Sequence, residues 1–253
     1  GGPSNSPAED WPRVACLFPA VLPQDVSFVR SQGSSFARHC AWSKVFVAQS
    51  AETETATGDL AGMEVVNLAK LFDMIADREF GVGWSTDADE MMAKVTKGNL
   101  VQKVLLMLIY TATHHLQDAD VFCRLDLDTA LITENLVAYM LVHNVTTQDV
   151  VYMGRLNTFW GVHTGDFPDG GAGICLTQAA LSVLSNILEQ RYAHFLDRSE
   201  LEREKENALF DAVAKKEASL EAGFSQCAFL PGFYDDIVLG RCLQEAGIAC
   251  HLG

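Results

Sequence analysis

Short apolar runs alternate with longer segments of helical spacing along the first half of the chain. The apolar runs predict strands at residues 13–18, 44–48 and 63–68. Residues 25–39 predict a helix. Residues 99–115 predict another, because Leu100, Val104 and Leu108 recur every four positions without an interrupting proline or glycine. This order of strands and helices favours an α/β fold.

The second half of the chain continues the same alternation. Strands are predicted at residues 121–123, 150–154 and 174–176, and helices at residues 134–142, from about 177 to 223, and from about 235 to 243. Residues 73–97 lack clear periodicity and predict an irregular insertion. The long helical segment has a charged middle that a core helix would not carry, so we interpret residues 190–222, approximately, as a solvated helical insertion.

The length of the chain suits one large α/β domain or two small ones. It has 253 residues, of which 49% are hydrophobic, enough for a sizeable core. We favour a single domain at residues 13–253 after a flexible leader at residues 1–12. No stretch is long and apolar enough to span a bilayer.

The charge balance limits the ligands that the chain can bind. Its 33 acidic and 18 basic residues give a formal net charge of -15. A general nucleic-acid-binding surface is therefore not expected. An anionic ligand would need a metal ion or local basic residues to hold it.

The seven cysteines contain no C-x-x-C pair, which argues against a zinc ribbon or a thioredoxin-type site. Disulfides remain possible. Because the count is odd, at least one thiol is free or pairs outside the chain, and Cys123 in a predicted strand is the expected buried one. Asn144-Val145-Thr146 is an acceptor sequence for N-glycosylation, which adds weak support for the secretory route.

Two carboxylates, Asp126 and Asp128, follow directly after the predicted strand at residues 121–123. At a spacing of two on extended chain, both side chains point the same way, so two hard oxygen donors can share one divalent cation or one polar ligand. A lone D-x-D is of low specificity and also occurs in solvated loops. Its interpretation therefore depends on its neighbours.

Two other segments are candidates for the same site. Gly170, Gly171 and Gly173 suit a tight turn where backbone approaches a ligand or another element, although an ordinary turn has the same pattern. Asp235 and Asp236 lie at or near the start of a predicted helix. That position favours carboxylates through capping and the helix dipole, whether or not they are catalytic.

Three blocks of sequence follow one another in a recognisable order. The first contains residues 103–110, His114-His115-Leu116, Ala119-Asp120-Val121-Phe122, Leu125-Asp126-Leu127-Asp128-Thr129 and Thr133-Glu134-Asn135-Leu136; the second Gly170-Gly171-Ala172-Gly173 and Leu176-Thr177-Gln178-Ala179-Ala180-Leu181; the third Asp235-Asp236-Ile237-Val238-Leu239-Gly240-Arg241-Cys242-Leu243. Together they resemble glycosyltransferase family 31, in its Fringe-like branch with the core 1 β1,3-galactosyltransferases. The resemblance extends over residues 14–247, approximately.

The resemblance implies a GT-A fold, a single Rossmann-like α/β domain whose D-x-D binds Mn²⁺ and, through it, the diphosphate of a UDP-sugar. The expected reaction is an inverting displacement in which a carboxylate deprotonates the acceptor hydroxyl. It would move a sugar, with galactose expected, to a glycan or glycoprotein acceptor in β1,3 linkage. The family also implies the Golgi lumen, a type II membrane anchor outside this chain, and leaves a homodimer open.

Carried over by position, the resemblance gives roles to individual residues. Asp126 and Asp128 match the D-x-D, with Asp128 as the expected direct metal ligand. Asp236 matches the catalytic base, and Asp235 occupies the neighbouring acidic position. Lys103 matches a lysine whose charge can help to hold donor phosphate.

Further residues complete the implied site. Gly170, Gly171, Ala172 and Gly173 match a backbone wall near donor and acceptor. Trp160 could be an aromatic sugar platform, although a core aromatic is the commoner case. The family's third metal ligand is a histidine well beyond the last block, and His251 is the one histidine in reach, at a shorter spacing.

The sequence departs from the family at Leu127, where the family has an aspartate. With the short spacing to His251, this leaves an alternative function, a non-catalytic relative that binds glycans or acts as a chaperone-type partner. The retention of Asp126, Asp128 and Asp236 favours the enzyme. A nucleotide-using enzyme of another class is disfavoured, because the chain lacks a P-loop and a strand-linked G-x-G-x-x-G.

Overall fold

A computed structural model describes residues 11–22, 24–47, 59–68, 100–157, 167–197, 227 and 235–251. Trp160, the irregular insertion predicted at residues 73–97 and the charged segment beyond residue 197 lie outside the described residues. The domain boundaries therefore stay predictions. Among the described residues, no helix has the length and apolar content that crossing a membrane requires.

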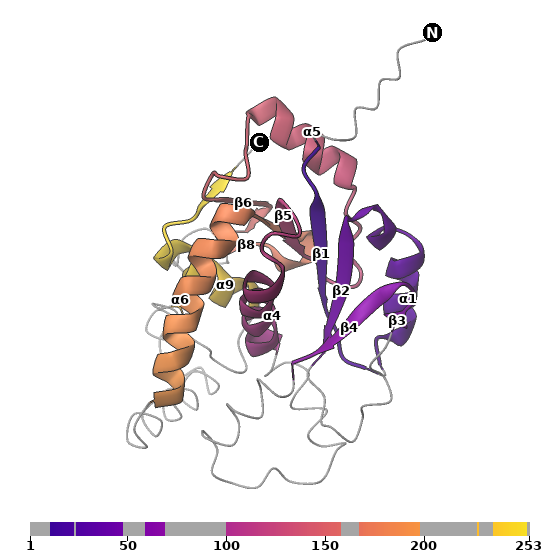
Figure 1. Cartoon of the computed structure of the whole chain (residues 1–253), viewed down its shortest axis with the longest axis horizontal. Helices are drawn as coiled ribbons and strands as arrows, with labels where there is room; N and C mark the ends of the chain where they lie inside the picture. Colours follow the sequence, from indigo (N-terminus) through magenta and orange to yellow (C-terminus); the bar gives the residue numbers. More distant parts are fainter. Residues whose placement is uncertain are drawn as a thin grey trace, which may run out of the picture.

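Eight strands in the described part of the chain form one mixed sheet (Figure 1). They are β1 (Val14–Pro19), β2 (Trp42–Val47), β3 (Asp59–Leu60), β4 (Met63–Asn67), β5 (Val121–Arg124), β6 (Val151–Gly154), β9 (Ile174–Thr177) and β10 (Ala249–His251). Their order is β10-β6-β9-β5-β1-β2-β4-β3. A separate two-stranded ribbon consists of β7 (Leu156–Asn157) and β8 (Phe167–Pro168).

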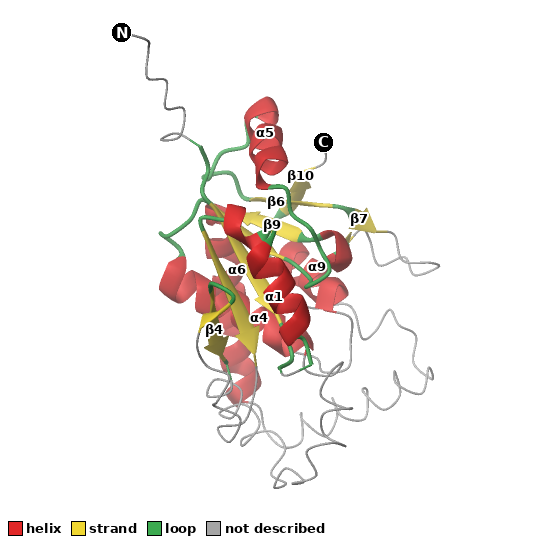
Figure 2. Cartoon of the chain, turned by 90° about the vertical axis from the view of Figure 1, so that its right-hand side faces the viewer, coloured by secondary structure: helices red, strands yellow, loops and turns green. Residues whose placement is uncertain are grey.

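Helices lie on both faces of the sheet. They are α1 (Val26–Ser34), α4 (Leu100–His115), α5 (Thr133–His143), α6 (Gln178–Asp197) and α9 (Asp235–Glu245), with short 3₁₀ turns η1 (Ala37–His39) and η3 (Gly170–Ala172). Residues of α4, α6 and α9 share one buried cluster with the sheet, and residues of α1 and α5 share the other. The turned view in Figure 2 shows α1 in front of the strands.

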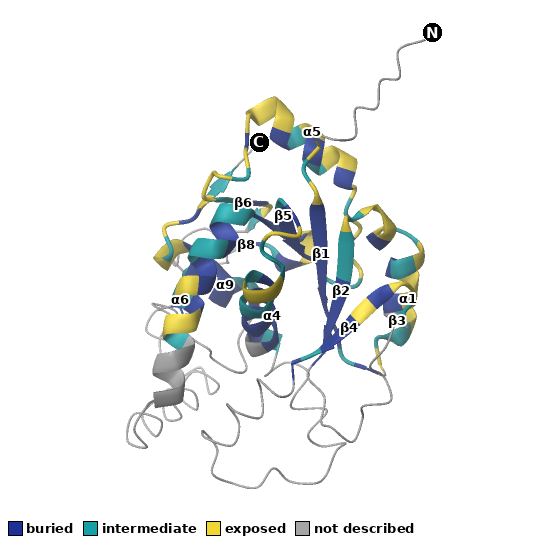
Figure 3. Cartoon of the chain, in the orientation of Figure 1, coloured by how far each residue is buried: buried dark blue, intermediate teal, exposed yellow. Residues whose placement is uncertain are grey.

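Strand β1 is at the centre of this arrangement, and all its residues are buried (Figure 3). Ala15 and Leu17 face the cluster of α4, whereas Cys16 and Phe18 face that of α1, as the alternation of side chains along a strand requires. This two-sided burial explains the continuous apolar run in the sequence.

The order in which strands are added to the sheet reverses at β1. Strand β1 pairs in parallel with β2 on one side and with β5 on the other. From β1 the chain proceeds to β2 and β4, and only after α4 does it return to β5. The carboxyl ends of β1 and β5 therefore meet at a topological switch point, where open α/β sheets bind their ligands.

The α/β prediction, with a Rossmann-like sheet flanked by helices, is confirmed. The helix predicted at residues 25–39 is shorter than expected and is followed by η1. The hydroxyls of Ser34 and Ser35 both donate to the carbonyl of Ser31, a local bonding pattern that competes with helix continuation. Strands β3, β7, β8 and β10 were not predicted, because each has only two or three residues.

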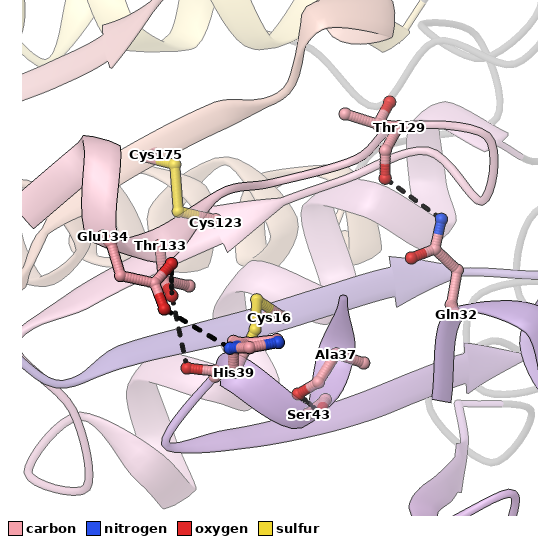
Figure 4. Close-up of a disulfide and its surroundings, with 11 residues drawn as sticks. Cys16, Gln32, Ala37, His39, Ser43, Cys123, Thr129, Thr133, Glu134 and Cys175 are labelled. Carbon is pink, nitrogen blue, oxygen red and sulfur yellow. Dashed lines mark hydrogen bonds and ion pairs between the residues drawn. A yellow bond between two sulfur atoms is a disulfide. The ribbon is translucent and has the colours of Figure 1, made fainter. Parts of the chain in front are cut away.

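Three disulfides link parts of the fold: Cys16–Cys40, Cys123–Cys175 and Cys227–Cys242. Cys123 is buried as predicted, but it is not a thiol, because Cys175 lies directly opposite it on the antiparallel strand β9 (Figure 4). Cys250 is the cysteine outside these three bonds. The long-range pairing was not readable from cysteine spacing.

Replacing Cys123 and Cys175 together by alanine should lower the free energy of unfolding by about 2–5 kcal/mol, because their bond closes a loop with a sequence separation of 52. Denaturant titration in buffer without a thiol reductant or an added oxidant measures this change. Cys250→Ala is the matched control and should have a much smaller effect. Equal stability of the double variant and the native chain would contradict a structural role for this disulfide.

Candidate functional site

Arg124, the last residue of β5, is the centre of the candidate site. Its side chain is only 1% exposed. Nη2 lies 2.5 Å from Oδ2 of Asp235 and 2.8 Å from Oδ1 of Asp126, and Nη1 donates to the carbonyl of Gly170 at 2.7 Å. One buried cation therefore joins the loop after β5, the glycine turn and the start of α9.

The two carboxylates make the burial of this cation possible. An unpaired guanidinium would lose its hydration without compensation in the protein interior. Asp235 is also largely buried, and as the first residue of α9 it lies at the positive end of the helix dipole. The sequence argument placed Asp235 and Asp126 in one site, and the structure brings them together through Arg124.

Asp236, the predicted base, lies against the glycine turn. A Cβ added to Gly170 would lie 3.3 Å from Cβ of Asp236 and 2.9 Å from Nη1 of Arg124, so a larger residue would displace both. Burial, followed by the charge of Asp235, raises the pKa of Asp236, against hydrogen bonds from the backbone of Ile237 and Gly170. A raised pKa brings a carboxylate closer to the range in which it accepts protons as a general base.

The remaining glycines of the turn pack against the segment that follows β5. Gly173 has φ +86°, a conformation that other residues adopt only with strain, and an added Cβ would lie 2.8 Å from Cδ2 of Leu125. Gly171 receives support from its neighbours, since its carbonyl accepts a bond from Thr129 Oγ1 at 2.8 Å and its N–H donates to Asp169. Ala172 is the last residue of the 3₁₀ turn η3.

A cavity of about 290 Å³ opens at the carboxyl ends of β1 and β5, at the switch point of the sheet. Its lining includes residues after β1, the start of α4 and the D-x-D: Pro19, Ala20, Val21, Asp25, Phe28, Leu100, Lys103, Asp126, Leu127 and Asp128. Both D-x-D residues therefore border the same cavity, although they lie in a turn closed by the bond from the N–H of Thr129 to the carbonyl of Asp126 and not on the extended chain that the spacing argument assumed.

The two carboxylates differ in their surroundings. The side chain of Asp126 is 34% exposed, and burial raises its pKa, although the neighbouring Arg124 opposes this shift. Asp128 is exposed. Nε2 of Gln32 holds their loop by donating to the carbonyl of Leu127 at 2.8 Å and to that of Thr129 at 3.0 Å. Figure 4 shows the bond to Thr129.

Lys103 lines the cavity from the first turn of α4. Its residue is buried, and Nζ donates to the carbonyl of Ala20 at 2.8 Å. Burial lowers the pKa of Lys103 to about 8, against the attraction of Asp25. Lys103 and the D-x-D therefore line the same cavity.

His251 does not line the cavity with the D-x-D and Lys103. Its ring contacts Tyr139, with 2.6 Å between Nδ1 and the tyrosine hydroxyl. Strands β6 and β9 separate β10 from β5, which corresponds to about 14 Å across the sheet. Among the described residues, no group of three or more His, Cys, Asp or Glu side chains could hold a metal ion.

Sequence reasoning gave no role to Arg124, Gln32 or Thr129. Arg124 had one visible signal, a charged residue at the end of an apolar strand, directly before the D-x-D. Its partners at Gly170 and Asp235 are 46 and 111 positions away, so the pairing is a property of the fold. Gln32 and Thr129 had no distinguishing pattern.

No protein-family model matches the chain, and no curated protein matches it. A solved structure with a similar arrangement is the apo crystal structure of mouse xyloside xylosyltransferase 1. The comparison has a TM-score of 0.39 and 15% sequence identity, and covers 95% of this chain and 84% of that chain. A likeness at this level carries no argument about the function of the chain.

Arg124→Met should lower the free energy of unfolding by about 3–5 kcal/mol, because it leaves two carboxylates near the protein interior without their cation. Adding Asp235→Asn to this variant should recover part of the loss, since one uncompensated charge is removed. Denaturant unfolding of the native chain, both single variants and the double variant gives the coupling energy. Additive effects would contradict a direct Arg124–Asp235 interaction.

The lowered pKa of Lys103 predicts a specific pH dependence. Between pH 8 and the usual lysine value of 10.5, the unfolded chain binds this proton more than the folded chain does, so stability should rise with pH. The contribution is about 3 kcal/mol over this window. Lys103→Met should lack this rise, so the free energy of unfolding of the native chain minus that of Lys103→Met should increase by about 3 kcal/mol from pH 8 to pH 10.5. Parallel profiles would contradict the assignment.

Proposed function

We propose that the chain is an inverting, metal-dependent glycosyltransferase of the GT-A type. It would move a sugar, with galactose expected, from a UDP-sugar to a hydroxyl of a glycan or glycoprotein acceptor in β1,3 linkage. The observation that carries this proposal is the cavity at the switch point, which is bordered by Asp126, Asp128 and Lys103. Arg124 connects this cavity to the segment that carries Asp236.

A divalent cation, Mn²⁺, would be held by Asp126 and Asp128. Both residues offer oxygen donors and line one cavity, and Arg124 pairs with Oδ1 of Asp126. Two carboxylates are an incomplete set for such a cation, so the diphosphate and water would supply the other ligands. When bound, the cation supplies Lewis-acid stabilisation of the charge that develops on the leaving diphosphate.

Lys103 and the cation would both reduce the repulsion between the acidic site and a nucleotide diphosphate. A chain with a net charge of -15 repels a nucleotide diphosphate, and the site itself contains four carboxylates, Asp126, Asp128, Asp235 and Asp236. Arg124 offsets part of this charge, and Lys103 adds a second cation on the cavity wall. Donor binding should therefore depend on added metal.

Asp236 would accept the proton of the acceptor hydroxyl. Asp235 is less suited to this role, because Arg124 holds its carboxylate in a buried ion pair. Asp236 forms no ion pair within the described part of the chain, and its raised pKa favours proton acceptance. Gly170, Gly171, Ala172 and Gly173 would form the wall along which donor and acceptor lie, and Trp160 stays a candidate sugar platform.

The chain would act in the lumen of the Golgi or another secretory compartment, as a type II membrane protein whose anchor is outside this chain. The three disulfides support this compartment, since such bonds persist in oxidising environments. The proposed partners are a UDP-sugar and a glycan or glycoprotein acceptor. A homodimer is an open possibility for the assembly.

A non-catalytic glycan-binding or chaperone-type protein is the second candidate. The observation that favours it is the lack of a third protein ligand next to Asp126 and Asp128 among the described residues. Such a protein would keep ligand binding and lack turnover. A chain that gains thermal stability from UDP-sugar or glycan but never releases UDP would support this candidate.

Turnover is tested by UDP release from a panel of UDP-sugars and glycan acceptors with Mn²⁺. We expect activity in the native chain and a loss of at least about 100-fold in Asp236→Asn, because general-base catalysis contributes about that much. Asp128→Ala should raise the Mn²⁺ concentration needed. Asp118→Asn, at an exposed carboxylate before β5, is the matched control. Unchanged turnover in Asp236→Asn would contradict the role of this residue.

A further inference from the structure

The loop after α5 contains a feature that the proposed activity does not use. Asn144-Val145-Thr146 is the one sequence of the type Asn-x-Ser/Thr, with x not proline, in the whole chain. Asn144 is exposed and caps the end of α5 in the left-handed conformation, with φ 54° and ψ 35°. Its backbone N–H bonds to α5, and no described residue has a recorded hydrogen bond to its side-chain amide.

This loop lies at the end of the sheet opposite the candidate site. The N–H of Ala179 bonds to the carbonyl of Thr147, and the neighbouring Gln178 bonds to the carbonyl of Asp120, directly before β5. The D-x-D follows the other end of β5, and the four residues of that strand span about 13 Å. A bulky group on Asn144 would therefore leave the cavity accessible.

Exposed aliphatic side chains lie next to Asn144. Leu141 and Val142 in the last turn of α5 are 56% and 75% exposed. The backbone N–H of Asn144 donates to the carbonyl of Leu141, so the acceptor directly follows this aliphatic turn. Figure 3 shows the exposed outer side of α5 at the top of the molecule. Adjacent exposed aliphatic residues favour association unless something covers them.

The disulfides supply a second, independent observation. All three require an oxidising compartment, and the secretory route is where Asn-x-Thr sequences are modified. An acceptor that was buried, or one with its amide engaged in the fold, would not fit a bulky, solubilising glycan. Asn144 is neither, and the aliphatic surface beside it gives the glycan a physical role.

We propose that Asn144 carries an N-linked oligosaccharide that covers the aliphatic end of α5 at Leu141 and Val142. The donor is an oligosaccharide linked to a lipid through a diphosphate. Nδ2 of Asn144 forms a bond to C1 of the first sugar and loses a proton, while the bond from C1 to the phosphate oxygen breaks and the lipid diphosphate leaves. This modification is independent of whether the chain transfers sugars itself.

The modification is tested on the full chain, produced behind a cleavable secretion leader in cultured animal cells. Secreted and cell-retained protein are both treated with peptide-N-glycosidase in ¹⁸O water, which removes an N-glycan and converts its asparagine to a labelled aspartate. We expect one glycan, with the label at position 144. Thr146→Ser should keep it, whereas Thr146→Ala and Asn144→Gln should lack it. A native chain without label at position 144 would overturn the proposal.

The covering role is tested by yield and aggregation. Asn144→Gln should lower the secreted monomer several-fold relative to the native chain, because exposed apolar surface reduces the folded population that leaves the cell. Adding Leu141→Ser and Val142→Ser to Asn144→Gln should restore the monomer without restoring the glycan. An Asn144→Gln chain secreted as monomer at the native level would refute the covering role, as would a triple variant without recovery.

Discussion

The buried guanidinium of Arg124 is the interaction on which the candidate site depends. It holds Asp126 after β5, the carbonyl of Gly170 and Asp235 at the start of α9 with a single side chain. A buried cation is costly to the fold unless its acceptors are placed well, so these segments are fixed relative to one another. The relative position of the D-x-D and Asp236 follows from this constraint.

Steric limits act together with this ion pair. Gly170 has no room for a Cβ between Arg124 and Asp236, and Gly173 combines a positive φ with close contact to Leu125. The glycine turn therefore packs directly against the end of β5. Because β1 and β5 meet at the switch point of the sheet, the cavity, the carboxylates and the turn come together at one edge.

The sequence predicted those features that depend on local pattern. The apolar run of β1 and the helical spacing of α4 gave the α/β class, because burial on a strand or helix repeats at short intervals. The D-x-D was predicted to border a ligand site, and both carboxylates border the cavity. Asp235 and Asp236 were predicted at the start of a helix, and they are the first two residues of α9.

Long-range pairing was not predictable in this way. The disulfide of Cys123 with Cys175 and the pairing of Arg124 with Asp235 depend on which segments the sheet brings together. His251 was a candidate metal ligand only through the family resemblance, at a spacing shorter than the family's, and it lies on β10 at the edge of the sheet, away from the D-x-D.

The proposed glycosyl transfer depends most on a cation that joins a nucleotide diphosphate to Asp126 and Asp128. Calorimetric titration with UDP-sugars, in the presence and absence of Mn²⁺, tests this directly. The account predicts that a UDP-sugar binds the native chain with Mn²⁺, and that binding becomes at least about tenfold weaker, or 1.4 kcal/mol, without the metal. Equal binding with and without Mn²⁺, or no binding of any UDP-sugar, would contradict it.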